Sequence, residues 1–359
     1  MLNIAIVGSG IAGLASALSL RRAGHAVQVF EASQLTAGDT DGAVAQIGPK
    51  VNKILEKWGV NLEVARPVLI DKIPVFGHDG TLLRTEEAPK PLGWSYYQRS
   101  RLHGALLRSA TAPTGAGRPV DILLNTEIKA IDPEAGLVVT QAGQTYHVDI
   151  IIGADGWNSI ARKAFPHNDT TIPAPAEVTV HLSVYTGEDN RIVQRFCTQP
   201  THYEKWLGPN IELKLYSIEP RTILIDTALP VQSVTELSEK GLKDALLSEF
   251  GSINSPLTEL LNAAGLADIK SWFHPNLPRV EEWTLGRAML IGDAAHPFLP
   301  FELPGTSQSI TGADALAEGL RSDVQVDDVP ERVACWVIPR KERVMTIQEM
   351  ERKDWPSRS

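Results

Sequence analysis

Residues 8–13 read GSGIAG and stand between a short apolar run and a stretch with helical spacing. In such a GxGxxG turn the first glycine permits a tight turn, the second admits a pyrophosphate, and the third lets helix and strand pack closely. Here these glycines are Gly8, Gly10 and Gly13, and the helix start adds free N–H groups. Glu31 ends the second apolar run, where a carboxylate binds a ribose 2′-hydroxyl. The pattern predicts a dinucleotide site; a glycine-rich turn of an unrelated α/β fold is the alternative.

Two further motifs place an acid directly after a buried strand. Residues 153–162 read GADGWNSIAR, and residues 286–297 read GRAMLIGDAAHP and run into Phe298. Taken alone, each motif is only a strand-to-turn junction that carries an aspartate, Asp155 or Asp293. In this order, behind the glycine-rich turn, they indicate one nucleotide site assembled from three turns.

The elements that must position these motifs follow from hydrophobic periodicity. Residues 3–7 and 26–30 are apolar runs typical of buried parallel strands, and residues 11–23 between them have helical spacing that Gly24 closes. Strand, helix and strand in this order form a βαβ unit. The same reasoning predicts further buried strands and helices in the flanking sequence: strands at 149–153 and 288–292, and helices at 50–58, 101–110 and 309–320.

The middle of the chain has a different pattern. Residues 120–148 predict short strands joined by turns. Longer, partly alternating runs then suit an antiparallel sheet with one covered face, at residues 178–185, 191–196, 211–218 and 222–229. Two helices follow, at 237–250 and 255–264. The sequence therefore predicts an α/β nucleotide domain interrupted by an antiparallel layer.

Composition narrows the class of protein. The chain has 359 residues, which suggests two domains or one large domain with an inserted layer. Its formal net charge of −9 argues against nucleic acid as a partner. Two cysteines give neither a disulfide framework nor metal-ligand spacing, so no metal is expected. The start of the chain lacks the features of a signal peptide, and no apolar run reaches ~20 residues, so we expect a cytoplasmic protein without stable membrane insertion.

Together, the three motifs resemble those of class A FAD-dependent monooxygenases, the family of salicylate hydroxylase and para-hydroxybenzoate hydroxylase. The resemblance extends from residue 2 to about residue 348. It implies a GR2-type, Rossmann-like FAD-binding domain of the para-hydroxybenzoate hydroxylase-like fold, with an inserted antiparallel sheet that binds the substrate. We predict residues 1–73, 97–165 and 277–359 for the FAD domain and residues 74–96 and 166–276 for the substrate domain. Residues 336–343 resemble the tail helix that closes the FAD domain.

The resemblance also implies the roles of individual residues. Asp293 would bind the ribityl chain, and Asp155 and Arg162 belong to a motif implicated in binding both FAD and NAD(P)H. Arg99 matches an arginine that opens a helix beside the flavin, although Arg101 is an alternative by a short shift in register. The full predicted FAD set is Gly8, Gly10, Ile11, Ala12, Gly13, Glu31, Ala32, Arg99, Asp155, Arg162, Gly292, Asp293, Pro300, Gly305, Thr306 and Ser307.

One turn departs from the family pattern. After Pro300 the family usually has a Gly-Gln-Gly turn that opens a helix, whereas the aligned residues here are Leu303, Pro304 and Gly305. Proline has no N–H group, so one donor toward the flavin would be lost. Gly305, Thr306 and Ser307 keep theirs, so the helix could still stabilise a reduced flavin anion.

Catalytic candidates lie on the predicted antiparallel strands. Besides Arg99, we single out Tyr216, Glu212 and His181. Each has a structural alternative: Tyr216 as a core tyrosine, Glu212 as a solvated strand residue, and His181 as an ordinary strand histidine. The wider set of polar and aromatic candidates adds Tyr185, Phe196, Tyr203 and Trp206.

The resemblance implies an oxidoreductase that uses FAD, a transiently bound NAD(P)H and O₂ to hydroxylate or epoxidise a small aromatic or unsaturated compound. A role in secondary metabolism is compatible with the unusual turn, and the chain would act as a monomer or homodimer. The alternatives are a flavin oxidase or dehydrogenase, and a flavoprotein in which FAD is structural and the pocket guides a non-redox cyclisation. The unusual turn motivates that last alternative.

Overall fold

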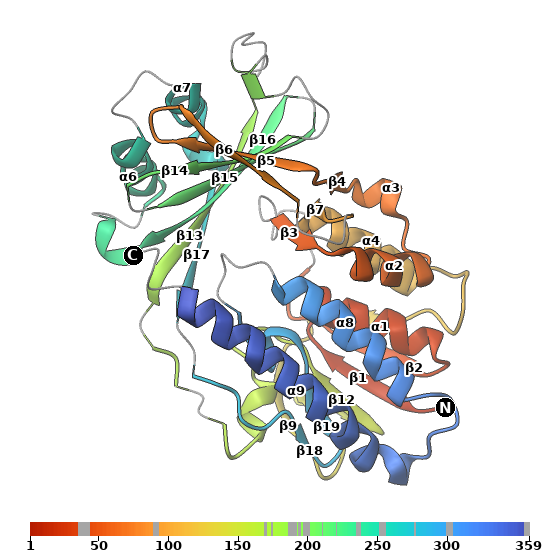
Figure 1. Ribbon diagram of the computed structural model, residues 1–359. Helices are drawn as coiled ribbons and strands as arrows, with labels where there is room; N and C mark the ends of the chain where they lie inside the picture. Colours follow the sequence, from red (N-terminus) through yellow and green to blue (C-terminus); the bar gives the residue numbers. More distant parts are fainter. Residues whose placement is uncertain are drawn as a thin grey trace.

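A mainly parallel sheet and a larger, mainly antiparallel sheet form two layers, with the small β3–β7–β4 sheet between them (Figure 1). The computed structural model describes residues 1–34, 44–88, 93–168, 171–173, 175–185, 192, 195–196, 202–209, 211–219, 221–234, 238–250, 256–275, 278–298 and 304–354. Over these residues, no helix is both long and apolar enough to cross a membrane.

The parallel layer is a six-stranded sheet in the order β18-β19-β12-β1-β2-β8. All neighbouring pairs are parallel except β18–β19 at one edge. The strands are β1 (Asn3–Val7), β2 (Ala26–Phe30), β8 (Asp121–Leu123), β12 (Ile150–Gly153), β18 (Thr284–Leu285) and β19 (Ala288–Leu290). The predicted strands at 3–7, 26–30, 149–153 and 288–292 thus all join one sheet.

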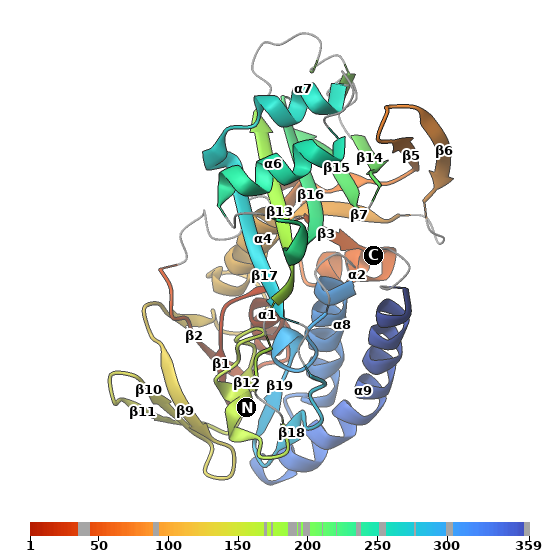
Figure 2. The same ribbon diagram turned by 90° about the vertical axis from the view of Figure 1, so that its left-hand side faces the viewer.

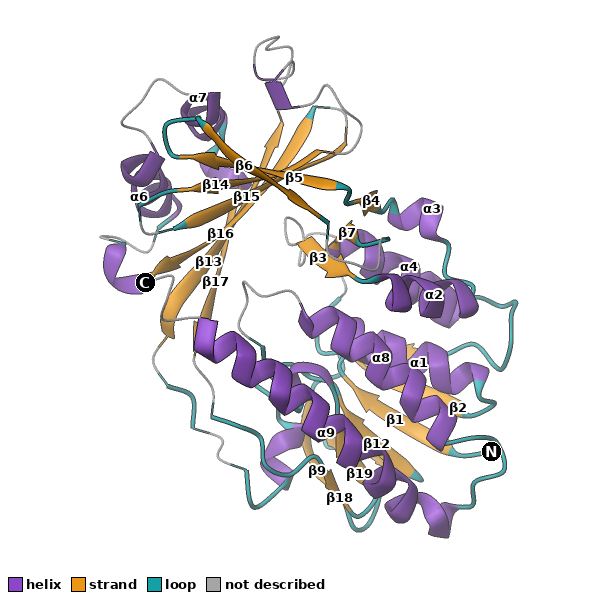
Figure 3. Ribbon diagram, in the orientation of Figure 1, coloured by secondary structure: helices purple, strands orange, loops and turns teal. Residues whose placement is uncertain are grey.

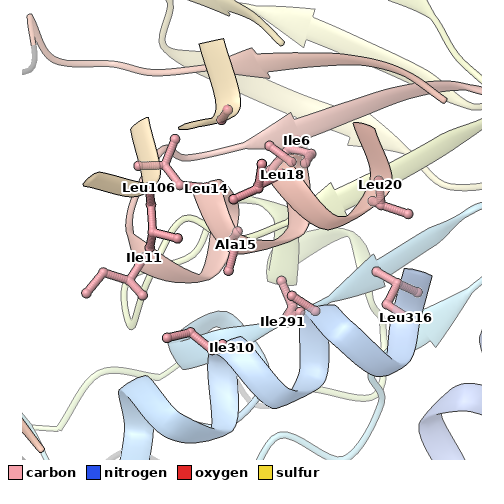
Figure 4. Packing of buried hydrophobic residues seen from close by; sticks show 14 of the residues in the cluster. Ile6, Ile11, Leu14, Ala15, Leu18, Leu20, Leu106, Ile291, Ile310 and Leu316 are labelled. Atoms are coloured by element: carbon pink, nitrogen blue, oxygen red, sulfur yellow. The ribbon is translucent and has the colours of Figure 1, made fainter. Parts of the chain in front are cut away.

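Helices cover one face of this sheet. Successive side chains of β1 alternate between the two faces, so each face of the sheet has its own apolar core. Ile4 and Ile6 pack with the helices, while Ala5 and Val7 pack on the opposite face. Figure 4 shows Ile6 beside Leu18 of α1 and, on the other side of α1 in this view, Ile310 and Leu316 of α8. The helices of this domain are α1 (Ile11–Arg22), α2 (Pro49–Lys57), α3 (Leu62–Ala65), α4 (Arg99–Thr111), α8 (Pro304–Gly319) and α9 (Val329–Asp354).

A second, three-stranded sheet covers the opposite face of the parallel layer. Its order is β11-β10-β9, from β9 (Ile128–Asp132), β10 (Leu137–Thr140) and β11 (Thr145–His147). Ile131 and Val138 of this sheet pack in one core with Val7 and Phe30. The turn-rich segment predicted at 120–148 is therefore a cover for the parallel sheet.

The antiparallel layer is a seven-stranded sheet in the order β17-β13-β16-β15-β14-β5-β6. All neighbouring pairs are antiparallel except β14–β5. Its strands are β5 (Lys72–Gly77), β6 (Leu82–Glu87), β13 (Pro175–Tyr185), β14 (His202–Leu207), β15 (Glu212–Glu219), β16 (Thr222–Pro230) and β17 (Ile269–Pro275).

Two helices, α6 (Glu239–Phe250) and α7 (Pro256–Ala263), cover the outer face of the seven-stranded sheet (Figures 2 and 3). Val180, Leu215 and Ile225 from three strands pack there with Leu246 and Phe250. The inner face is turned toward the small sheet of β3 (Val44–Ile47), β7 (Ser95–Gln98) and β4 (Val68–Leu69).

The sequence was wrong at one strand. Residues 191–196 were predicted to form a strand, but Ile192, Arg195 and Phe196 are helical. Four strands of the seven-stranded sheet, β5, β6, β14 and β17, were not predicted from the sequence. Apolar residues at 192 and 196 also suit a helix, because a short run does not distinguish the two periods. Two predicted domain boundaries, after residues 73 and 96, fall inside β5 and β7, so the division by residue number stays a prediction.

The outer-face core gives a stability prediction. Phe250 has no exposed surface and packs between α6 and the sheet, so Phe250→Ala should lower the free energy of unfolding by about 3–5 kcal/mol. Ser248→Ala, at an exposed position on the same helix, should change it by no more than ~0.5 kcal/mol. Urea denaturation followed by tryptophan fluorescence at saturating FAD measures both; similar losses in the two variants would contradict the packing described here.

Candidate active site

The glycine-rich turn lies between β1 and α1, against the end of β12. Gly8 has a φ of +95°, and a Cβ there would lie 2.6 Å from the carbonyl oxygen of Ala154. A Cβ on Gly13 would lie 2.0 Å from the carbonyl oxygen of Gly8. Gly10, the N-cap of α1, has open space in its Cβ direction among the described residues. Two glycines are therefore required by the chain's own packing, and the middle one leaves room beside the unpaired N–H groups of the helix start.

Two side chains hold Ser9, in the middle of this turn. Glu31, just after β2, accepts hydrogen bonds from the backbone N–H of Ser9 at 2.9 Å, from its hydroxyl at 2.6 Å, and from the N–H of Ser33 at 2.8 Å. Burial raises the pKa of Glu31, but these hydrogen bonds outweigh it and leave the pKa below its usual value. His103 on α4 contacts the Ser9 carbonyl oxygen through Nε2 at 2.8 Å, a residue that the sequence did not single out.

Asp155 organises its own turn after β12. Its carboxylate accepts hydrogen bonds from the Ser159 hydroxyl at 2.5 Å and from the backbone N–H groups of Ile160 and Ala161 at 2.8 and 3.0 Å. The last two of these donors stand at the start of the 3₁₀ turn Ala161–Ala164, so the carboxylate holds the beginning of that turn in place. The FAD or NAD(P)H contact of Asp155 stays a prediction.

Arg162 joins the second motif to the third. Its buried guanidinium donates to the carbonyl oxygens of Ala294 at 2.8 Å and Asp293 at 2.9 Å, and to that of Trp157 at 3.1 Å. Burial lowers the pKa of Arg162, and the nearby carboxylates Asp155 and Asp293 act against that shift. Motifs far apart in the sequence are thus held together by one side chain.

Asp293 stands at the junction of the parallel sheet and α4. Burial raises the pKa of its carboxyl, and the positive charges of Arg99 and Arg162 act against that shift. Arg101 instead lies near Arg66, and burial and that charge lower the pKa of Arg101. Of the two arginines that the sequence left open, Arg99 is therefore the one whose charge reaches Asp293.

The third motif leads to the start of α8. Pro304 is the first residue of α8. The N–H group at this position makes no hydrogen bond within a helix, so its absence in proline does not weaken the helix. The N–H groups of residues 305–307 follow it, and a Cβ on Gly305 would lie 4.0 Å from Oδ1 of Asp293. The Ser307 hydroxyl donates to the carbonyl oxygen of Gln46 on β3 at 3.3 Å. Pro300 and Leu303 lie outside the described residues.

These turns fit the nucleotide half and the ribityl chain of FAD. The open space at Gly10 adjoins the N–H groups of α1, which suits a pyrophosphate. Within the described residues, the Asp293 carboxylate makes no hydrogen bond and so is available to hydroxyl groups. Gly292, with a φ of +62°, lets its turn approach Ala12 so closely that a Cβ would lie 2.5 Å from the Ala12 side chain. Both loops therefore border one space.

The inner face of the seven-stranded sheet carries polar side chains, because they alternate with the apolar residues of the outer face. The strand registers pair Lys205 with Lys214, Lys214 with Asp226, Asp226 with His181, and His181 with Lys270. These five residues form one row across β14, β15, β16, β13 and β17, which we call the inner row.

The strongest contact of the inner row joins β13 to β16. Nδ1 of His181 lies 2.5 Å from Oδ1 of Asp226, and both side chains are largely buried. The Trp272 ring on β17 packs edge-on against the imidazole, with centroids 4.8 Å apart. Glu212 lies on the same face, with an oxygen 4.0 Å from Nζ of Lys214.

Three tyrosines pack beside the inner row. Tyr216 is fully buried between Tyr96 of β7 and Tyr203 of β14, with ring centroids 4.7 and 4.9 Å away. Burial raises the pKa of the Tyr216 hydroxyl, and the neighbouring Tyr203 and Tyr96 and, to a smaller extent, Asp226 act in the same direction. That hydroxyl has no hydrogen-bond partner among the described residues. Tyr216 is thus a core tyrosine that also carries an unpaired polar group.

The predicted catalytic residues therefore divide between two places. His181, Glu212 and Tyr216 share the inner face, whereas Arg99 lies near Asp293 at the start of α4. β7 connects the two places, because Tyr96 is on it and Arg99 directly follows it. Among the other candidates, Tyr203 joins this face, Phe196 and Trp206 lie in the outer core, and Tyr185 is exposed. Asp226 and Lys214 also lie on this face, although they were not among the predicted site residues. They alternate with the apolar residues of β15 and β16, and this alternation is a sequence signal that could have predicted their position.

His296 of the third motif is fully enclosed. Its ring packs against Trp283 and Phe298, and its Nδ1 atom has no hydrogen-bond partner among the described residues. Burial, and secondarily the charge of Arg340, lowers its pKa to about 3. His296 is therefore uncharged near neutral pH and serves packing.

Comparison with known proteins gives one family across almost the whole chain. A family model described as "FAD binding domain" matches residues 1–345. The FAD-dependent monooxygenase cfoG of Aspergillus candidus is 30% identical over 97% of this chain and 84% of its own length. The hispidin-3-hydroxylase of Neonothopanus nambi is 28% identical over 95% and 86%. The 3-hydroxybenzoate 6-hydroxylase of Polaromonas naphthalenivorans is 29% identical over 96% and 85%.

Solved structures share the fold at lower identity. CtdE in complex with FAD and a substrate superimposes with a TM-score of 0.84 at 20% identity, covering 98% of this chain and 88% of its own. Klebsiella pneumoniae HpxO in complex with FAD and uric acid gives a TM-score of 0.82 at 17% identity, covering 98% and 87%.

The two glycine environments predict different outcomes for the same substitution. Gly10→Ala places a methyl group in open space, so the chain should fold but bind FAD roughly tenfold or more weakly, about 1.4 kcal/mol. Gly13→Ala places it against the Gly8 carbonyl and should lower the free energy of unfolding by about 1–3 kcal/mol or more. Flavin fluorescence titration and thermal unfolding of the apoprotein measure the two effects. Unchanged FAD affinity in Gly10→Ala would contradict the proposed approach of the pyrophosphate.

The enclosed His296 predicts a loss of stability in acid. Because its folded pKa, about 3, is below the unfolded value of about 6.5, the unfolded chain binds the extra proton between them. This contribution is complete above about pH 6.5 and falls by about 1.4 kcal/mol per pH unit below it. His296→Phe should therefore flatten the decline in stability from pH 6.5 to about 5, and His147→Phe, at an exposed site, should not. Urea midpoints at each pH measure this; parallel declines in wild type and His296→Phe would exclude it.

Proposed function

Because the chain belongs to the FAD binding domain family and is an FAD-dependent monooxygenase like its curated relatives, we propose that NAD(P)H and O₂ are its co-substrates and that it oxygenates a small aromatic or unsaturated compound. Hydroxylation of an aromatic ring is the reaction that the site supports best. A tailoring step in secondary metabolism belongs to the same proposal.

The observation that carries the proposal is the meeting of two differently built surfaces. One consists of glycine-rich turns, Asp293 and the start of α8, which suit FAD. The other is the inner face of the seven-stranded sheet, where aromatic rings adjoin ionisable groups. Tyr96 belongs to the second surface, and the segment that holds it continues into Arg99 at the first.

On the FAD side, each group has a definite task. The N–H groups at the start of α1 would bind the pyrophosphate, Glu31 the ribose, and Asp293 the ribityl hydroxyls. The N–H groups of residues 305–307 and Arg99 would stabilise negative charge on the ring system. FAD held by these groups would supply the redox chemistry, namely acceptance of a hydride from the nicotinamide and transfer of one oxygen atom of O₂ to the substrate.

On the substrate side, the partly exposed Trp272 lies beside His181 on the inner face, which favours an aromatic substrate. Tyr96 and Tyr203 are buried in the tyrosine cluster behind it. Two relatives have names that denote hydroxylation of hispidin and of 3-hydroxybenzoate, and HpxO has uric acid bound. Among the described residues there is a single glycine-rich βαβ unit, which is consistent with transient binding of NAD(P)H. The alternative of a non-redox flavoprotein rested on the loss of an N–H donor at Pro304. Since Pro304 is the first residue of α8, the N–H groups of residues 305–307 still follow it at the start of the helix, which weakens that alternative.

The proposal predicts substrate-stimulated reduction of a yellow holoenzyme. NADH and NADPH oxidation in air should rise several-fold with at least one member of a panel of phenols, indoles and alkenes, with oxygen from O₂ found in the product. Absorbance of the nicotinamide and mass spectrometry under ¹⁸O₂ measure this. A flavin that no nicotinamide reduces, with or without these compounds, would overturn the proposal in favour of an oxidase or a structural flavoprotein.

A further inference from the structure

The imidazole of His181 is arranged to take up a proton. Its Nδ1 faces Oδ1 of Asp226 at 2.5 Å, so in the neutral ring Nδ1 carries the proton and Nε2 keeps its lone pair. Within the described residues, Nε2 has no hydrogen-bond partner, and the imidazole keeps some exposed surface. A carboxylate behind one ring nitrogen fixes the tautomer and stabilises the imidazolium that forms.

The location of the pair indicates a ligand rather than a purely structural bridge. His181 and Asp226 lie on the inner face, while α6 and α7 cover the outer one. Nearby, the buried Tyr216 hydroxyl lacks a partner among the described residues, although a buried hydroxyl normally has one. Asp226 is close enough to raise the pKa of that hydroxyl, so the two observations concern one site.

Building on the proposed function, we infer that His181 is the base that takes a proton from a hydroxyl group on the aromatic ring of the substrate, with Asp226 as its positioning residue. The O–H bond of the substrate breaks and an N–H bond forms at Nε2. The oxygen keeps the electron pair, which makes the ring more electron-rich and hence easier to oxygenate. The substrate class is then hydroxylated aromatic compounds, rather than alkenes or ethers.

This base stands on a different strand from the one that the family resemblance suggests. A histidine is often found in the family where Glu212 stands on β15, whereas His181 is on β13, beyond β16 in the sheet order. Glu212 adjoins Lys214 instead. The charged and titratable groups that share the inner face with His181 on the described neighbouring elements are Asp226 of β16, Lys270 of β17, Lys214 and Glu212 of β15, Lys205 of β14, and the tyrosines 96, 203 and 216.

Binding of 4-nitrophenol to the holoenzyme tests the inference without turnover. Its anion and neutral form differ in visible absorbance, so difference spectra report the protonation state of the bound phenol. The wild type should bind it mainly as the anion at a pH below the pKa of the free phenol. His181→Asn can keep a hydrogen bond to Asp226 but has no base, so it should bind the neutral phenol. His147→Asn, at an exposed site, is the matched control.

Turnover gives an independent readout with phenols and their O-methyl ethers. His181→Asn should lower kcat for a phenol by about 100-fold near neutral pH, and the loss should shrink as pH approaches the pKa of the phenol itself. A merely structural role would give a loss that does not depend on pH in this way. Asp226→Asn should show the same pH dependence with a smaller loss.

Several outcomes would overturn the inference: an equal anion fraction in His181→Asn, ethers oxygenated as fast as phenols, or a wild type that binds no phenol. Oxygenation of alkenes alone would uphold the proposed monooxygenase while excluding His181 as the base. The opposite result is a holoenzyme that binds the phenol as its anion but that no nicotinamide reduces. This result would support His181 as the proton acceptor and overturn the proposed function.

Discussion

The site depends on one close approach of backbone to backbone, at the carboxyl ends of β1 and β12. The carbonyl oxygen of Ala154 occupies the space that a Cβ on Gly8 would need, and the carbonyl oxygen of Gly8 does the same at Gly13. Because the core of the parallel sheet fixes both strands, the helix start cannot move away to admit a larger residue. This contact aims the N–H groups of α1 at one space and brings the turns after β12 and β19 to its border.

Ionisable side chains around that space mostly hold the turns rather than face a ligand. Glu31 and His103 fix Ser9, Asp155 caps its own turn, and Arg162 binds the turn of Asp293. Polar groups that are removed from water are costly unless they are hydrogen-bonded, and each of these side chains contacts backbone groups of the turns. Fixed loops in turn supply preorganised donors, which is what a cofactor with phosphates and a ring that becomes negatively charged requires.

The seven-stranded sheet uses strand alternation to separate stability from chemistry. Its outer residues pack with α6 and α7, while its inner residues form the inner row and the tyrosine cluster. Moving any strand by one residue would exchange the two faces, so the apolar contacts that stabilise the fold also set which polar groups meet. The pairing of His181 with Asp226 is thus a product of the same register that buries Val180 and Ile225.

The sequence by itself determined the βαβ unit, the three nucleotide motifs and the family, because these depend on local spacing: a glycine's freedom, an apolar period, an acid after a strand. It failed at residues 191–196, where a short apolar run fits helix and strand alike, and it did not predict β5, β6, β14 and β17 of the seven-stranded sheet. Only the tertiary structure placed the charge of Arg99 near Asp293 and Arg101 near Arg66, enclosed Tyr216 in a cluster of tyrosines, and paired His181 with an aspartate that is remote in sequence. The reason is physical: local propensity acts over a few residues, whereas strand register and helix orientation are set by packing between segments distant in the chain.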